Sequence, residues 1–252
     1  MSRLNALVVG LGNYTHPLTR HSISQLTLEN IHNLLNHHHR YNVNSVASAF
    51  PSSPSSHEEA LSRLQSVQSG SDLSNHLKLS KPNSAWIAKH DFQSFNGTSP
   101  INLTLHLLKP RAAMNISGPI VQSYHSQLSK SGHPTKLIII HDELDLKPLV
   151  VRLKRPPQSS KHKGHNGLRS VFASLRAYSP QNLYTIGIGV GRDVSNPSKD
   201  PGDVGRWVLS PLTRPEIEAC SWDVEDSPSS NPQHRGSVVL EAWKQILEII
   251  RN

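Results

Sequence analysis

Polar side chains recur in this sequence where apolar runs end and helical patterns begin. The residues placed in this way are Asn13, His21, Asn115, Asp142, His165 and Asn166. In open α/β sheets, ligands bind beyond the carboxyl ends of the strands, so these side chains are candidates for one shared crevice. The competing interpretation is a set of independent helix caps and hydrogen-bonded turn residues.

A histidine next to a carboxylate is suited to activate water. Neutral imidazole accepts a proton near neutral pH, and an aspartate on its other ring nitrogen fixes the tautomer and stabilises the imidazolium. Asparagine amides can donate to a developing oxyanion without adding charge. The adjacent His141 and Asp142 also resemble metal ligands of some helical phosphohydrolases. Their position directly after the almost wholly apolar run 136–140 favours an orienting or catalytic Asp142 without a metal, and a solvated acidic turn is the alternative.

Positive charge is concentrated in one part of the chain. Residues 147–192 contain no Asp or Glu and carry nine cations, whereas the whole protein has a net charge of +8. The nine are Lys147, Arg152, Lys154, Arg155, Lys161, Lys163, Arg169, Arg176 and Arg192. A stretch of one sign over this length predicts a phosphate-binding surface, and a solvated basic face without a partner is the alternative.

The hydrophobic pattern predicts the elements that position these residues. Strands are expected at residues 4–9, 85–88, 103–108, 136–140, 150–153 and 183–190, and helices at about 22–35, 116–128, 164–175 and 237–250. Strands alternating with helices predict a single α/β domain over residues 1–252. Polar, serine-rich composition predicts loop insertions at about 42–80 and 90–101.

Composition and motifs exclude several classes of protein. The single cysteine, Cys220, excludes an internal disulfide framework and a multi-cysteine zinc site, and it favours a reducing compartment. The sequence contains no run of 18 apolar residues, so no transmembrane helix is predicted. Gly10 and Gly12 follow a strand, but Thr15 replaces the third glycine of a dinucleotide fingerprint, so the glycines are expected to permit a tight turn.

Five motifs occur in an order that resembles a known family. They are Val9-Gly10-Leu11-Gly12-Asn13, Thr19-Arg20-His21-Ser22, Met114-Asn115-Ile116-Ser117-Gly118, His141-Asp142-Glu143-Leu144-Asp145-Leu146 and Lys163-Gly164-His165-Asn166-Gly167-Leu168-Arg169-Ser170. In this order they resemble the bacterial-type peptidyl-tRNA hydrolases over most of the chain. The resemblance implies a monomer with a twisted mixed β-sheet flanked by helices. It also implies hydrolysis of the ester between a peptide and the 3′ end of tRNA, without a metal or other cofactor.

The resemblance also implies roles for the polar residues. His21 is expected to be the catalytic base and Asp142 its orienting partner. Asn13 is expected to distinguish N-blocked from free aminoacyl-tRNA, and Asn115 and Asn166 to contact the substrate. His165 is counted with the substrate-binding residues, and Lys161 and Lys163 with those that hold tRNA phosphates. A cytoplasmic location is expected, with the mitochondrion as the alternative.

The chain departs from the family pattern around the first motif. His16 stands where the family usually has Tyr, Ala113 replaces an aromatic residue, and Pro156-Pro157-Gln158-Ser159-Ser160 replaces a glycine-rich stretch. These changes affect residues expected to bind substrate rather than the base. An RNA-binding protein of the same fold that has lost hydrolysis, with a structural or splicing role, is the second hypothesis. Retention of Asn13, His21, Asn115, Asp142 and Asn166 favours the enzyme, because a binding protein need not keep them.

Overall fold

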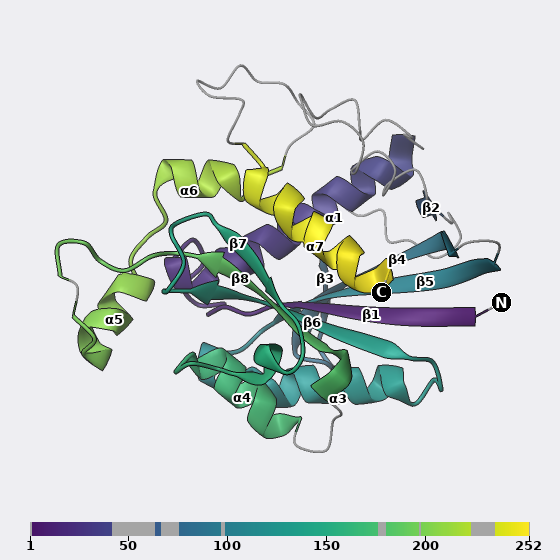
Figure 1. Ribbon diagram of the computed structural model, residues 1–252, viewed down its shortest axis with the longest axis horizontal. Coiled ribbons are helices and arrows are strands. Elements are labelled where there is room, and N and C mark those ends of the chain that lie inside the picture. The colour runs from purple at the N-terminus through teal and green to yellow at the C-terminus, as the bar shows by residue number, and fades with distance from the viewer. Residues whose placement is uncertain are drawn as a thin grey trace.

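An eight-stranded mixed β-sheet forms the centre of the protein in a computed structural model (Figure 1). The structure describes residues 2–41, 64–66, 76–96, 99–175, 180–196, 198–222 and 235–251. The strands are β1 (Ser2–Gly10), β2 (Leu64–Ser66), β3 (Lys78–Ser80), β4 (Ala85–Asn96), β5 (Ser99–Pro110), β6 (Thr135–Glu143), β7 (Val151–Lys154) and β8 (Leu183–Gly189). Their order is β2-β4-β5-β1-β6-β8-β7, and β3 also pairs with β4.

The four central strands, β5, β1, β6 and β8, are parallel, while β4 and β7 run antiparallel to their neighbours. Residues Leu137 to Ile140 of β6 are fully buried, because helices cover both faces of the sheet here. Such burial explains the almost wholly apolar sequence of this strand. The predicted α/β class and sheet flanked by helices are confirmed.

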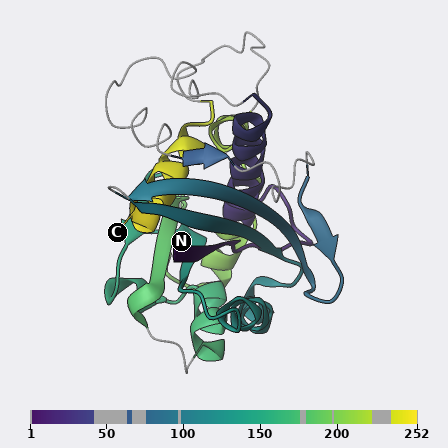
Figure 2. The same cartoon turned by 90° about the vertical axis from the view of Figure 1, so that its right-hand side faces the viewer.

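Two helical layers cover the two faces of the sheet (Figures 1 and 2). The helices are α1 (Ile23–Tyr41), α3 (Gly118–Ser129), α4 (Asn166–Ser174), α5 (Pro201–Val208), α6 (Arg214–Ala219) and α7 (Ser237–Arg251). The larger core packs α1 and α7 against one face, where Ile31 and Ile246 are fully buried. The smaller core packs α3 and α4 against the other face, through residues such as Val121 and Val171.

Gly10 and Gly12 allow α1 to lie close to the end of β1. A Cβ atom on Gly10 would lie 2.8 Å from the carbonyl oxygen of Ser24, and one on Gly12 would lie 2.6 Å from side-chain atoms of Gln25. Both distances are shorter than real Cβ contacts. The glycines are therefore required by helix packing rather than by the tight turn expected from the sequence.

The expected loop at 90–101 is wrong, because residues 90–96 and 99–101 belong to strands of the sheet. Strand β4 extends to Asn96, β5 begins at Ser99, and the two pair antiparallel throughout their length. Backbone hydrogen bonds of the ladder hold the polar stretch in place, so it needs little hydrophobic signal. Within the expected insertion at 42–80, β2 and β3 pair with β4, and most of the remainder lies outside the described residues.

The carboxyl ends of β1, β6 and β8 lie at the same edge of the sheet, next to α5 and the start of α4 (Figure 1). This edge positions the polar residues singled out in the sequence. Within the described parts of the chain, no helix is both long enough and apolar enough to cross a bilayer.

Candidate functional site

His21 and Asp142 form a hydrogen-bonded pair at the carboxyl edge of the sheet. His21 lies in the 3-10 helix η1 (Arg20–Ser22), which precedes α1, and Asp142 is the penultimate residue of β6. The His21 Nδ1 atom lies 3.0 Å from each carboxylate oxygen of Asp142. Because a carboxylate can only accept, His21 carries its proton on Nδ1 and has Nε2 free to accept a proton in its neutral form.

The environment strengthens this pairing. Burial by itself lowers the pKa of His21, but the charge of Asp142 and its hydrogen bond outweigh burial, so the pKa is raised. Burial by itself raises the pKa of Asp142, but the neighbouring imidazoles, His21 first, hold it well below its usual range. Asp142 therefore remains ionised near neutral pH, and His21 can stabilise an added proton.

A second histidine contacts the same carboxylate. The His165 Nε2 atom lies 2.9 Å from Asp142 Oδ1, and its Nδ1 atom accepts hydrogen bonds from the backbone amides of Gly167 and Leu168. His165 is thus the N-cap of α4. With Nδ1 accepting and Nε2 donating, neither ring nitrogen is available to take a proton from water, so His165 is not an alternative base in this arrangement.

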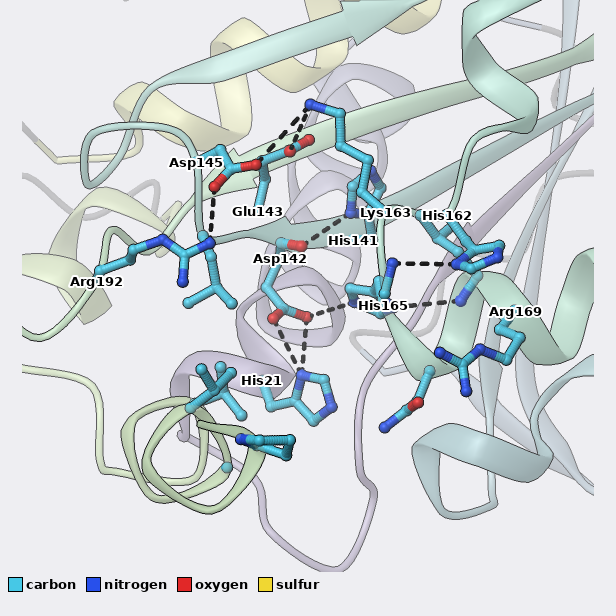
Figure 3. Close-up of a pocket in the computed structure, with 18 of the residues that line it drawn as sticks. His21, His141, Asp142, Glu143, Asp145, His162, Lys163, His165, Arg169 and Arg192 are labelled. Carbon is cyan, nitrogen blue, oxygen red and sulfur yellow. Dashed lines mark hydrogen bonds and ion pairs between the residues drawn. The ribbon is translucent and has the colours of Figure 1, made fainter. Parts of the chain in front are cut away.

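The pair opens into a cavity of about 600 Å³ (Figure 3). His21, Asp142, His165 and Asn166 line this cavity together with Lys161 and Lys163, so the structure brings six of the eight expected site residues together. The cavity also receives side chains that the sequence pattern did not single out individually as site residues. These are Glu143, Lys154, Arg169, Arg192 and Lys199, among others. Lys199 lies outside the basic segment 147–192, and only the fold brings it to the cavity.

Some cations of the cavity lie next to a carboxylate, and others do not. Glu143 forms an ion pair with Lys154 and lies 3.9 Å from Lys163. Asp145 lies 3.9 Å from Lys163 and 2.9 Å from Arg192. Lys161 has no ion pair with any residue that the structure describes. The positive charge of Lys161 is therefore less compensated than that of Lys163.

The three asparagines occupy different positions. Asn166 lines the main cavity and an adjoining one of about 500 Å³, and Arg169, one turn later on α4, lines both as well. Asn115 lines only the adjoining cavity. Asn13 lines neither, and its Oδ1 atom accepts a hydrogen bond from Thr15. The predicted crevice is therefore a pair of cavities that meet at Asn166 and Arg169, with Asn13 outside their walls.

Asn13 is nevertheless tied to the helical turn that carries His21. Its backbone amide donates to Ser22 Oγ at 3.1 Å, and Ser22 Oγ in turn donates to the Asn13 carbonyl oxygen. The next residue, Tyr14, packs against Trp86 with ring centroids 6.1 Å apart, and Arg111 lies over the Tyr14 ring. An aromatic surface flanked by a cation therefore follows Asn13.

Arg20 anchors the turn that carries His21 to the segments beyond β8. Its guanidinium donates to Glu216 at 3.1 Å and to the Pro211 carbonyl oxygen at 2.9 Å, and it lies 4.1 Å from the centre of the Trp207 ring. Both side chains of the Arg20–Glu216 pair are about 9% exposed. Residues 201–208 line the cavity through Pro201, Val204, Gly205 and Val208. The network thus connects one wall of the cavity to the candidate base.

Three side chains of the site lie close enough together to be compared with a metal site. One potential ligand atom from each of His21, Asp142 and His165 lies within 4.8 Å of the others. A metal on His165 Nε2 would require that atom to lose its proton, which would move to Nδ1. Protonated Nδ1 could no longer accept from the two amides of α4. The hydrogen bonds of His165 therefore oppose metal binding at this position.

Comparison with known proteins identifies similar chains. The family described as peptidyl-tRNA hydrolase matches residues 70–227, more than half of the chain. This match contains Asp142 and His165, whereas His21 precedes it. A peptidyl-tRNA hydrolase of Saccharomyces cerevisiae is 36% identical over 105 residues, covering 42% of this chain and 52% of its own. One from Dichelobacter nodosus is 37% identical over 108 residues, covering 41% and 51%. The chain thus spans about half the length of the curated relatives it matches.

Solved structures extend the likeness to the whole fold. A peptidyl-tRNA hydrolase crystallised with N-propanol superposes with a TM-score of 0.54 at 20% identity, covering 97% of this chain and 91% of the other. The peptidyl-tRNA hydrolase of Acinetobacter baumannii gives a TM-score of 0.51 at 20% identity, covering 98% and 94%. These structures share the fold over nearly the whole chain, whereas the family match begins at residue 70.

Proposed function

The chain belongs to the peptidyl-tRNA hydrolase family, and on that premise we propose that it hydrolyses the ester between a peptide, or an N-blocked amino acid, and the 3′ end of tRNA. The products are free tRNA and a peptide acid, which returns the tRNA to translation. The observation that carries the proposal is the His21–Asp142 pair at a cavity lined by cations. The relatives' names support the same reaction.

In the proposed reaction, His21 Nε2 takes a proton from water while the water oxygen forms a bond to the ester carbonyl carbon. Asp142 holds the opposite ring nitrogen and stabilises the imidazolium that results. The bond between carbon and the 3′ oxygen then breaks, and the imidazolium returns the proton to that oxygen. An ester needs no stronger acid for this leaving group. Because Asp142 acts on the imidazole and not on the substrate, removing its charge would weaken proton transfer rather than substrate binding.

The polar residues around the pair would position the substrate. Asn166, at the junction of the two cavities, is placed to contact the ester or the adjoining peptide, and Asn115 extends that surface. Asn13 is proposed to read the blocked amino group, although it lies outside the cavity walls. Lys161 and Lys163 would bind phosphates of the tRNA, with Arg169, Arg192 and Lys199 nearby. We further propose that the protein works as a monomer in the cytoplasm, with the mitochondrion as the alternative.

Hydrolysis of N-acetyl-aminoacyl-tRNA, followed with and without EDTA, tests the proposal. We expect hydrolysis at the same rate in both conditions, and slower hydrolysis of aminoacyl-tRNA with a free amino group. Binding of tRNA without hydrolysis would instead indicate an RNA-binding protein, a hypothesis that no feature of the site favours. Loss of activity in EDTA and its return with a divalent ion would indicate a metal at His21, Asp142 and His165.

A further inference from the structure

We propose that His165 is a positioning residue, which holds the Asp142 carboxylate in place for His21 through a ring whose tautomer is fixed by the start of α4. This inference rests on the proposed function, because it assigns a role within the same site. It also differs from the expectation that His165 binds substrate. The argument depends on which ring nitrogen of His165 donates and which accepts.

The start of α4 fixes the tautomer of His165. The amide nitrogens of Gly167 and Leu168 lie 3.1 and 3.2 Å from His165 Nδ1, and an amide can only donate. Nδ1 therefore carries no proton, and the ring proton resides on Nε2. This atom lies 2.9 Å from Asp142 Oδ1, where it donates. The helix end thus makes His165 a donor directed at the carboxylate.

The carboxylate lies between two imidazole donors. Asp142 Oδ1 accepts from both His21 Nδ1 and His165 Nε2, while Oδ2 accepts from His21 alone. The side chain of Asp142 is about 3% exposed, so water cannot readily replace a lost donor. Without His165, Asp142 Oδ1 would lose one of its two hydrogen-bond donors in a buried site, and the carboxylate could turn away from His21.

Other charged and titratable groups around this arrangement do not duplicate it. The His141 ring lies edge-on to His165 with centroids 5.3 Å apart, and its Nδ1 donates to the Asp142 backbone carbonyl oxygen rather than to the carboxylate. Glu143 and Asp145 face the cations Lys154, Lys163 and Arg192. The other titratable and charged side chains that line the cavity are Lys161, His162, Arg169 and Lys199. Among the residues that the structure describes, only His21 and His165 donate side-chain hydrogen bonds to the Asp142 carboxylate.

Two substitutions separate the two hydrogen-bonding roles of the ring. In His165→Asn, the amide oxygen occupies the place of Nδ1 and can still cap α4, but the side chain is too short to reach Asp142. In His165→Gln, the amide nitrogen occupies the place of Nε2 and can still donate to Asp142, but the cap is lost. The two variants and the parent are compared in the hydrolysis of N-acetyl-aminoacyl-tRNA.

We expect His165→Asn to lower kcat by roughly 10-fold with KM within about 2-fold of the parent, since misplacing a catalytic group costs rate rather than binding. His165→Gln should keep kcat within a few-fold and lower the Tm by roughly 2–4 °C through loss of the cap. Parental kcat with a raised KM in His165→Asn would overturn the inference, because it would make His165 a substrate contact.

A measurement without substrate keeps the inference separable from the proposed activity. Long-range proton–nitrogen NMR of the histidine rings should show His165 of the parent protonated at Nε2. In His165→Asn the pKa of His21 should fall, since a carboxylate that turns away stabilises the imidazolium less, and a rise would mean that Asp142 stays in place without His165. Protonation of His165 at Nδ1, or an unchanged His21 titration in His165→Asn, would overturn the positioning role. If the parent does not hydrolyse the ester, the proposed function fails, and these spectra still decide the role of His165.

Discussion

At the scale of single residues, His21 and Asp142 make different contributions to the proposed reaction. His21→Ala removes the proton acceptor and leaves the cations of the cavity in place. We expect kcat for N-acetyl-aminoacyl-tRNA to fall by roughly 10²-fold or more, the scale of general-base catalysis, with tRNA affinity nearly unchanged. Single-turnover hydrolysis and tRNA binding by the same protein measure both quantities. Near-parental turnover would place the base elsewhere.

Asp142→Asn keeps the shape of the partner and removes its charge. Asp142 raises the pKa of His21 against the opposing effect of burial, so the substitution should let that pKa fall. Because only neutral His21 accepts a proton, activity is lost as pH falls through this pKa. The acidic limb of the pH–rate profile should therefore move to lower pH, with kcat reduced no more than in His21→Ala. A limb that moves to higher pH would contradict the pairing.

Lys161 and Lys163 should contribute unequally to tRNA binding. Lys163 lies within 3.9 Å of both Glu143 and Asp145, whereas Lys161 has no ion pair among the described residues. Lys161→Ala should raise KM and reduce the slope of log affinity against log salt by about 0.7–0.9, the value for one lost phosphate contact. Lys163→Ala should reduce it less. The exposed Lys130, which does not line the cavity, provides the control.

Single residues also show where sequence reasoning ends. His21 and Asp142 are 121 positions apart, and only the family motif related them. The sequence predicts one role of His165, the capping of a helix, because His165 stands at the start of a helical pattern. Its hydrogen bond to Asp142 depends on the distance between β6 and α4 in space, which no local pattern encodes. The same holds for Lys199, which reaches the cavity only through the path of the chain after β8.

At the scale of elements, the Arg20–Glu216 ion pair should hold α6 and the segment before it to η1. Glu216→Gln keeps the acceptor oxygen of the capping box at Thr213 but removes the charge that pairs with buried Arg20. Breaking a buried pair in this way costs about 3–5 kcal/mol, because one charge is left uncompensated. Urea unfolding should show a loss of this order. A loss below about 1 kcal/mol would mean that Arg20 is satisfied by Ser210, Pro211 and Trp207 alone.

Glu218→Gln is a matched control on the same helix. Glu218 pairs with Arg214 at 2.8 Å, but the Arg214 side chain is 83% exposed, so solvent screens the pair. An exposed pair of this spacing contributes about 0.3–0.5 kcal/mol. The difference between the two glutamate variants therefore isolates the effect of burial from that of helix position.

The serine-rich segment before β3 should be dispensable for the chemistry. Deleting residues 46–73 removes β2, which pairs with only three residues of β4 at the edge of the sheet, and leaves every residue of the cavity. A long surface connection adds only slowly to the entropy cost of folding. We expect ester hydrolysis within several-fold of the parent. Insoluble or unfolded protein would show that the segment belongs to the core.

The elements predicted from hydrophobic periodicity are those that bury an apolar face. Strand β8 and helix α7 lie within one residue of their predicted bounds, because burial selects their residues directly, whereas α1 and β6 begin as predicted but extend further, to Tyr41 and Glu143. The ends of β4 and β5 were missed, since their register is maintained by backbone hydrogen bonds between polar residues such as Gln93 and Asn102. Backbone pairing leaves little trace in side-chain polarity, so composition alone indicated a loop.

At the scale of the whole molecule, the distribution of charge fits the proposed tRNA substrate. The carboxylates Glu143 and Asp145 lie within the basic cavity and hold Lys154, Lys163 and Arg192 in place, while Lys161 remains without an ion pair among the described residues. In the proposed function, the net charge of +8 would steer tRNA toward the protein, and the local arrangement of cations would determine where its phosphates bind. Affinity for tRNA should consequently depend on salt more strongly than turnover does.

Stability of the whole molecule should decrease in mild acid through its buried histidines. Burial lowers the pKa of His106 to about 4 and that of His141 to about 4, and it lowers the pKa of His125 as well. An unfolded histidine has a pKa near 6.5, so between pH 6.5 and 4 the unfolded chain binds more protons than the folded one. The free energy of unfolding must then fall as pH falls through this range.

His21 does not offset this effect. Its pKa is raised by folding, so its stabilising contribution is already complete below pH 6.5 and is lost only as pH rises through its folded pKa. The pKa of Asp142 lies below its usual range, so its contribution is lost only in stronger acid. Across the range from pH 6.5 to 5, we expect the buried neutral histidines of the described residues to set most of the slope, with His106 and His141 contributing about 1–2 kcal/mol each by pH 5.

Urea unfolding of the parent and of His106→Gln at pH 7, 6 and 5 measures this slope. His106 is chosen because it lies on β5, away from the cavity, and is only 7% exposed. His106→Gln removes one titrating group, so its stability should change less between pH 7 and 5 than that of the parent, whatever its absolute value. Tyr124→Phe removes the hydroxyl that lies 3.0 Å from His106 Nδ1 but leaves the imidazole, and it should keep most of the parental slope. Equal slopes in the parent and His106→Gln would show that His106 takes up protons equally in the folded and unfolded states.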